Sequence, residues 1–199
     1  MTLSSDTRGG STVGILLAAG EGRRMGRPKA LMSDPDGTSW LLRACAALDV
    51  GGCDAVTVVL GAAAAEAREL LADVPVDVIV APDWRSGMSA SLRAGLGFLV
   101  EGDAALLHLV DLPDVGSEVV ARVLTATPAG DPRAALARAA YAGVPGHPVL
   151  LGRHHWPGVL SSAAGDQGAR RYLAEHPPEL VECGDLATGV DVDHLPASS

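Results

Sequence analysis

The sequence has a single lysine, few cysteines, no long apolar run and no excess of positive charge, and these shortages exclude several classes of protein. Its formal net charge is -9 at pH 7, so nucleic acid and anionic membranes would repel it and are not expected partners. No apolar run approaches the roughly 20 residues of a membrane span. Cys45, Cys53 and Cys183 have neither the close spacing of a zinc site nor the even count of a disulfide framework. They are expected to be core residues of a protein in the reducing cytoplasm.

The apolar sequence that is present suffices for one core. The chain has 199 residues, of which 48% are hydrophobic, and this length favours a single compact domain. We expect that domain over residues 12–196, after a polar, disordered lead at residues 1–11 and before a loose tail at residues 197–199.

A glycine-rich stretch follows the first apolar run. Residues 13–19 are continuously apolar and too short for a helix, which predicts a strand buried on both faces. Gly20, Gly22 and Gly26 permit backbone conformations closed to other residues and bring N–H groups close to a ligand. Together with the neighbouring arginines and Lys29, the only lysine of the chain, they suit a polyphosphate.

Two better-known glycine loops do not fit this stretch. For a dinucleotide fingerprint the third glycine stands one position late, and for a Walker loop Lys29 lies between a proline and an alanine. A plain turn with surface arginines would need neither three glycines nor four cations.

Strands and helices alternate through the first half of the chain. After the first strand, the predicted strands are residues 54–60, 76–81 and 104–110, and the predicted helices between the first three strands are residues 41–48 and 62–72. Thr38 or Ser39 is expected to cap the first helix, with Leu42 among its buried residues. This rhythm predicts parallel strands with right-handed crossovers, whose carboxyl ends meet at one edge and form a binding crevice.

Two later stretches deliver polar groups to that edge. Residues 83–95 bring hydroxyls and a helix start, with Met88 and Leu92 directed inward, although an ordinary capped helix would explain Ser89 equally well. Asp111 ends a buried strand, where a carboxylate suits Mg²⁺ on triphosphate oxygens. Asp114 is expected to cap the helix that follows.

The second half of the chain is expected to supply the last strands of the sheet. Residues 134–141 and 179–183 are predicted strands, the latter at an edge, and residues 141–151 place a rigid loop before a short strand. The glycines and prolines of that loop favour close approach of a ligand to the backbone, against the alternative of a bland loop. Arg170 opens a helix after a polar turn, and its charge alone would indicate a solvated arginine.

Five blocks in this order resemble one family. The spacing Leu17-Ala-Ala-Gly20-x-x-x-Arg24-Met25-Gly26-x-x-Lys29 is similar to the signature of the MobA-like nucleotidyltransferases, and its Ala-Ala-Gly form to the molybdenum cofactor cytidylyltransferases among them. Residues 84–95, 111–113, 145–150 together with 165–170, and 189–196 resemble the later blocks, with Leu112 for a methionine and His194-Leu195 for Thr-Pro.

The resemblance implies a three-layer α/β/α Rossmann-like fold of the nucleotide-diphospho-sugar transferase type, with a mostly parallel sheet and a late antiparallel strand. It also implies roles for individual residues. Arg24 and Lys29 would be catalytic, Asp111 and Asp193 would bind metal with Asp191 as the alternative to Asp193, and His147 and Arg170 would contact the acceptor. The nucleotide would bind to Leu17, Ala18, Ala19, Gly20, Gly22, Gly26, Gly87, Met88 and Ser91.

The implied reaction transfers CMP from CTP to the phosphate of molybdenum-molybdopterin and releases pyrophosphate, with Mg²⁺ as cofactor and a molybdoenzyme or its chaperone as protein partner. A guanylyltransferase or sugar-phosphate nucleotidyltransferase of the same fold is the alternative. A non-catalytic nucleotide sensor would lack the metal carboxylates. A nicotinamide oxidoreductase would need an acidic ribose ligand where Gly61 and Ala62 stand.

Overall fold

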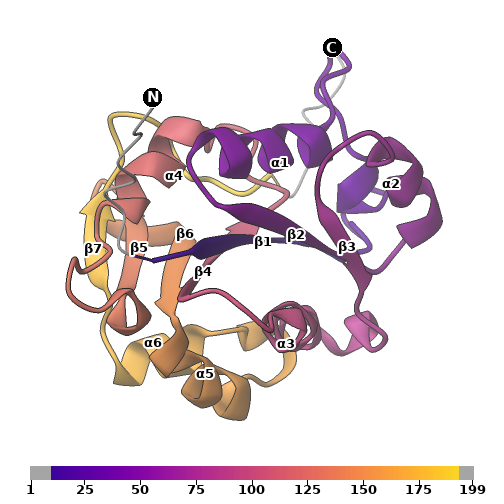
Figure 1. The fold of residues 1–199 in the computed structure, drawn as a ribbon. Coiled ribbons are helices and arrows are strands. Elements are labelled where there is room, and N and C mark those ends of the chain that lie inside the picture. The colour runs from indigo at the N-terminus through magenta and orange to yellow at the C-terminus, as the bar shows by residue number, and fades with distance from the viewer. Residues whose placement is uncertain (1–9, 193–199) are drawn as a thin grey trace, which may run out of the picture.

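One mixed sheet of seven strands organises residues 10–192, the part of the chain that the computed structural model describes (Figure 1). Its strand order is β3-β2-β1-β4-β6-β5-β7. The strands are β1 Thr12–Ala18, β2 Ala55–Leu60, β3 Asp77–Val80, β4 Ala104–Leu109, β5 Leu136–Tyr141, β6 Val144–Gly152 and β7 Glu179–Glu182.

The strand directions confirm the predicted sheet. β1 pairs in parallel with β2 and β4, β3 is parallel to β2, and β7 is parallel to β5. β6 is antiparallel to both of its neighbours, β4 and β5. The sheet is therefore mostly parallel, with one late strand reversed among the described residues.

Helices cover both faces of the sheet, as Figure 1 shows. On one side lie α1, α2 and α4, and on the other α3, α5 and α6. The helices are α1 Trp40–Val50, α2 Ala64–Leu70, α3 Met88–Phe98, α4 Ser117–Leu124, α5 Trp156–Ser162 and α6 Arg170–Glu175. Alternate residues of β1 serve the two layers, because Leu16 packs with α1 and Ile15 with α3. This confirms the three-layer α/β/α architecture.

Gly95 brings α3 close to the central strand. A Cβ at this position would lie 2.8 Å from Cγ2 of Ile15 and 3.2 Å from Cγ2 of Val59, so the helix needs a residue without a side chain here. The close contact positions the amino end of α3 beside the carboxyl end of β1, where the predicted crevice lies.

Several local predictions were wrong. Gly116, not Asp114, is the N-cap of α4, and the Asp114 carboxylate instead accepts hydrogen bonds from the backbone N–H and the hydroxyl of Thr188. Leu42 and Met88 are exposed, since α1 buries the opposite flank of its helix and Met88 begins α3 at a cavity. The expected rigid loop before β6 is a hairpin, and Val144 already pairs with Tyr141. Ser39 caps α1 as expected, accepting from the Leu42 N–H.

Three sequence predictions fall outside the described residues: most of the lead, at residues 1–9, the metal ligand Asp193, and the tail at residues 197–199. Cys45, Cys53 and Cys183, all within the described part, are buried and form no disulfide. Between residues 10 and 192 no helix combines the length and apolarity needed to cross a bilayer.

Candidate active site

The glycine loop after β1 folds back on itself. The backbone N–H of Met25 donates to the carbonyl of Gly22 (2.8 Å), and that of Lys29 donates to Gly20 (3.2 Å). Gly22 has φ +62°, and a Cβ there would lie 1.9 Å from the carbonyl oxygen of Arg27. Glycine is required here by both conformation and space. The closed loop returns Lys29 to the end of β1.

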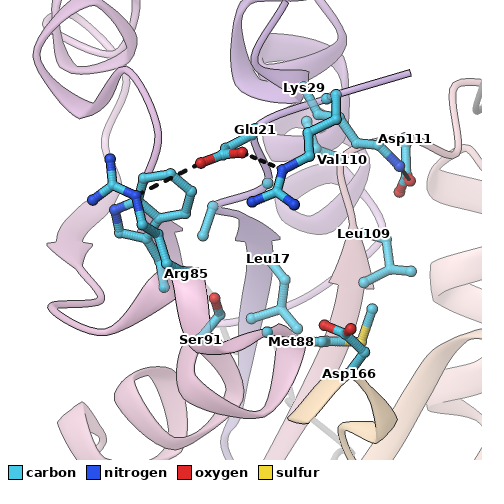
Figure 2. Close-up of a pocket in the computed structure, with 16 residues that line it drawn as sticks. Leu17, Glu21, Lys29, Arg85, Met88, Ser91, Leu109, Val110, Asp111 and Asp166 are labelled. Atoms are coloured by element: carbon cyan, nitrogen blue, oxygen red, sulfur yellow. Dashed lines mark hydrogen bonds and ion pairs between the residues drawn. The ribbon is translucent and has the colours of Figure 1, made fainter. Parts of the chain in front are cut away.

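An ion pair joins Lys29 to Asp111 (Figure 2). The Nζ of Lys29, at the end of the loop, contacts Oδ2 of Asp111, which follows β4. β1 and β4 are neighbours in parallel, so their carboxyl ends bring together two residues that are 82 positions apart. The two side chains are 21% and 10% exposed.

A cavity of about 350 Å³, named here the loop cavity, lies on one side of this ion pair. It opens between the glycine loop and the start of α3, as Figure 2 shows. Seven of the predicted nucleotide-binding residues line it: Leu17, Ala19, Gly20, Gly22, Gly87, Met88 and Ser91. The structure therefore brings these seven residues together on one surface.

A second cavity of about 310 Å³, named here the β6 cavity, is lined by both predicted acceptor residues, His147 and Arg170. Its other polar groups include Arg138, Gln167 and Asp191. Its apolar wall consists of residues such as Leu92, Leu107, Val149 and Leu173.

The two cavities share their border. Lys29 and Asp111 line both of them, as do Leu17, Met88 and Leu109. A ligand in each cavity would therefore meet its neighbour at one cation and one carboxylate, which is the arrangement required for transfer of a charged group between two bound molecules.

Three predicted site residues lie away from both cavities. Ala18 is buried in the core beneath the loop. Arg24 and Gly26 lie on the exposed outer turn of the loop, where Gly26 has φ +69°. Asp191 lines the β6 cavity, and the backbone N–H of its neighbour Val192 donates to the carbonyl of Asp111 (3.0 Å).

Sequence reasoning missed charged residues at the loop cavity. Glu21 accepts from Nε of Arg23 (2.6 Å) and lies 3.7 Å from Nε of Arg85, so a carboxylate links the glycine loop to the segment before α3 (Figure 2). The guanidinium of Arg85 stacks over the ring of Trp84, 4.5 Å from its centroid. Glu21 lies between Gly20 and Gly22, where a side chain must face the loop or solvent. This position in the sequence could have indicated a charged residue at the cavity.

Asp166 and Arg138 were missed as well. Asp166 lies against Gly87, where a Cβ would approach its Oδ1 to 2.3 Å, so the turn before α6 closes directly on the start of α3. The hydroxyl of Ser89 accepts from the Gly168 N–H (3.1 Å) and holds the same junction. Arg138 stands in a strand otherwise made of apolar residues, and a charge at that place was the overlooked signal.

His147 is half-buried in β6, beside the β6 cavity. Burial lowers its pKa to about 3, with smaller contributions from Arg138, His108 and Arg170. The imidazole is therefore neutral at physiological pH, and a neutral ring can donate one hydrogen bond and accept another. This agrees with a contact role and not with a cationic one.

The carboxylates present suit a hard divalent cation. The Lys29 ammonium lies against Asp111 in the position of a cation, and Asp191 faces the same cavity. Across residues 10–192 no three His, Cys, Asp or Glu side chains cluster as a metal site. Mg²⁺ needs only one or two carboxylates when substrate phosphates complete its shell, so Asp111 and Asp191 fit such an ion.

Comparison with known proteins agrees with the family that the sequence resembles. The model of the MobA-like NTP transferase domain matches residues 14–180. A relative from Paenarthrobacter nicotinovorans, named nicotine blue oxidoreductase, is 36% identical over 190 residues, which is 90% of this chain and 91% of that protein.

Solved structures agree in the same way. Rv0371c of Mycobacterium tuberculosis H37Rv superposes with a TM-score of 0.76 at 27% identity over 94% of both chains, and it has also been solved as a manganese complex. A nucleotidyl transferase of Methanothermobacter has a TM-score of 0.78 at 23% identity over 92% of both chains, a likeness of fold. The family model and the 36% identical relative both span most of the chain, which therefore belongs to the MobA-like NTP transferase family and is an enzyme of that nucleotidyltransferase type.

Proposed function

We propose that this protein transfers CMP from CTP to the phosphate group of molybdenum-molybdopterin and releases pyrophosphate. The observation that carries the proposal is the shared border of the two cavities, where Lys29 and Asp111 face both. The choice of CTP and of molybdopterin comes from the Ala-Ala-Gly form of the first motif and from the Gly-Asp-x-Gly-Ala-Arg string at residues 165–170. A cytoplasmic setting and delivery of the product to a molybdoenzyme or its chaperone belong to the same proposal.

In this mechanism the loop cavity holds the triphosphate. The N–H groups of the glycine loop and the Lys29 ammonium bind the β- and γ-phosphates and stabilise the charge that develops at the α-phosphate. Arg24, on the outer turn of the loop, has a catalytic role only if the loop closes over the nucleotide. Gly87, Met88 and Ser91 line the base and ribose.

The β6 cavity holds the acceptor beside it. An acceptor phosphate is ionised at neutral pH, so its oxygen attacks the α-phosphate without a general base, and catalysis reduces to positioning and charge stabilisation. His147 and Arg170 orient the acceptor. A bound Mg²⁺, held by Asp111 with Asp191 or Asp193, supplies charge neutralisation to the phosphates.

Pyrophosphate release tests the proposal. CTP, GTP, ATP and UTP are each combined with molybdopterin or with sugar phosphates, in Mg²⁺ or Mn²⁺. Release with CTP and molybdopterin is the expected result. Release with GTP, or with a sugar phosphate, would replace the substrate assignment by the guanylyl or sugar alternative. Tight nucleotide binding without release from any pair would contradict the proposal and favour a nucleotide sensor.

Reduction of nicotine blue is a second candidate, because the relative at 36% identity is named nicotine blue oxidoreductase. A nicotinamide nucleotide would occupy the loop cavity, and its acceptor would lie against the apolar wall of the β6 cavity. Against it, Gly61 and Ala62 follow β2 at the position of an acidic ribose ligand. Oxidation of NADH or NADPH with nicotine blue, followed at 340 nm, would support reduction, and its absence would leave nucleotidyl transfer.

A further inference from the structure

Arg138 is an unusual residue for its position in the sheet. It stands in the middle of β5, flanked by Ala137 and Ala139, and it is paired in register with Val149 of β6. Val149 belongs to the core beneath α3, α5 and α6, so Arg138 stands on that face and lines the β6 cavity. Burial of a guanidinium among apolar side chains costs free energy unless a partner compensates for it.

The carbonyl of Gly146 fixes the guanidinium of Arg138. Nε and Nη2 both donate to this oxygen, at 3.1 and 2.9 Å. Gly146 itself packs on the ring of Tyr141, where a Cβ would lie 2.7 Å from Cε2, so the carbonyl cannot easily move. Two of the five N–H donors are used in this way, and three remain for a ligand in the cavity.

No carboxylate neutralises Arg138. Within residues 10–192 neither Arg138 nor Arg170 has an acidic side chain at ion-pair distance. Burial, and to a smaller extent the charge of Arg170, lowers the pKa of Arg138. Two like charges thus share one cavity, whose wall also carries Asp191 and the ion pair of Lys29 and Asp111. This arrangement is unfavourable in the empty protein and becomes favourable when an anion binds.

We propose that Arg138 and Arg170 together bind the anionic group of the acceptor, and that Arg138 makes the β6 cavity select phosphate monoester dianions over singly charged acceptors. This inference rests on the proposed function only in calling the bound anion the acceptor of the reaction. Planar guanidinium groups bind phosphate with two parallel hydrogen bonds. Arg138 is half-buried and Arg170 is exposed. A dianion neutralises both cations, whereas a monoanion leaves one of them uncompensated. The apolar wall then accommodates the part of the acceptor that carries the phosphate.

Binding of two matched probes tests this assignment. Phenyl phosphate is a dianion at pH 8 because its second pKa is about 6, and benzenesulfonate carries one charge on the same ring. Calorimetric titration is carried out on the wild type, Arg138→Met and Arg138→Lys. The matched control is Arg171→Gln, which removes an exposed arginine paired only with Glu175 among the described residues.

The expected result is a loss of about tenfold or more in phenyl phosphate affinity for Arg138→Met, since a charge-assisted hydrogen bond is lost. Arg138→Lys keeps the charge without the planar guanidinium, so its phenyl phosphate affinity should lie between those of the wild type and Arg138→Met. Benzenesulfonate affinity should change by less than about threefold, and Arg171→Gln should leave both affinities unchanged.

Equal loss of both probes would overturn the selection of dianions, and an unchanged phenyl phosphate affinity in folded Arg138→Met would overturn the site itself. These outcomes separate from the proposed function. Phenyl phosphate binding that depends on Arg138, without pyrophosphate release from any substrate pair, would support this inference and contradict nucleotidyl transfer. Pyrophosphate release by Arg138→Met with an unchanged KM for the acceptor would support nucleotidyl transfer and contradict this inference.

Discussion

Replacement of Lys29 by methionine removes the cation that both cavities share and keeps the length of the side chain. The ion pair with Asp111 joins side chains that are 21% and 10% exposed. Loss of one partner costs about 3–5 kcal/mol for a fully buried pair and about 0–1 kcal/mol for an exposed one. We expect an intermediate loss of about 1–2 kcal/mol in the free energy of unfolding, less than the roughly 5–15 kcal/mol of a typical domain, so the variant should fold.

The effect on turnover should be larger than the effect on stability. A lost charge-stabilising donor at a reacting group typically reduces kcat about 100- to 1000-fold. The double variant Lys29→Met/Asp111→Asn separates the two effects, because it removes the Asp111 carboxylate together with the cation. Its free energy of unfolding should return to within about 0.5 kcal/mol of the wild type, while its turnover stays low.

Pyrophosphate release with CTP and molybdopterin measures turnover, and urea unfolding measures stability. Arg171→Gln serves as the control for loss of a cation from the surface. Turnover of folded Lys29→Met within roughly threefold of the wild type, a change of about 0.6 kcal/mol in the barrier, would refute the role of Lys29.

Acid unfolding tests His108, whose ring has no hydrogen-bond partner among the described residues and whose pKa burial lowers to about 4. Below about pH 6.5 the unfolded chain binds a proton on His108, whereas the folded chain does not until about pH 4. The free energy of unfolding should therefore fall by on the order of 3 kcal/mol between these two pH values. His108→Leu should reduce that loss in urea unfolding at pH 7 and pH 4.5, and equal pH dependence in both proteins would contradict the cause. Gly95→Val should cost about 1–3 kcal/mol because its side chain meets Ile15 at 2.8 Å; an unchanged urea midpoint would show that α3 can move away. Gly22→Ala should weaken CTP binding about tenfold or more, because φ is +62° and the Cβ meets the carbonyl oxygen of Arg27; wild-type affinity by calorimetry would mean that this loop conformation is not needed.

Local patterns predicted the first half of the fold well and pointed to residues that meet at the loop cavity. Residues 13–19 form β1 as their continuous apolar character indicated, because a short apolar run between turns suits a strand buried on both faces. Glycine spacing predicted the tight loop after β1, since a Cβ at Gly22 would lie 1.9 Å from the carbonyl oxygen of Arg27. Asp111 was expected at the crevice because it follows a buried strand, and parallel strands end at one edge. Each of these inferences depends on residues close together in the chain.

Local patterns failed where a distant segment supplied the better partner. Asp114 has the chemistry of a helix cap, but it bonds Thr188, 74 positions away, and Gly116 begins α4 instead. Hairpin pairing with β5 took residues 144–148 into β6, although Pro145, Gly146 and Pro148 indicated a loop. Propensity is a weak preference of a few tenths of a kcal/mol to about 1 kcal/mol, which tertiary contacts readily exceed.

The sequence by itself determined the order of strands and helices, the glycine loop and the family, because periodicity, turn chemistry and motif spacing are properties of neighbouring residues. Tertiary structure alone decided that Lys29 pairs with Asp111, that Asp166 closes on Gly87 and that Arg138 shares a cavity with Arg170. The physical reason is that strand order and helix packing select which distant side chains meet. In this protein those contacts determine which charged side chains line the loop cavity and the β6 cavity.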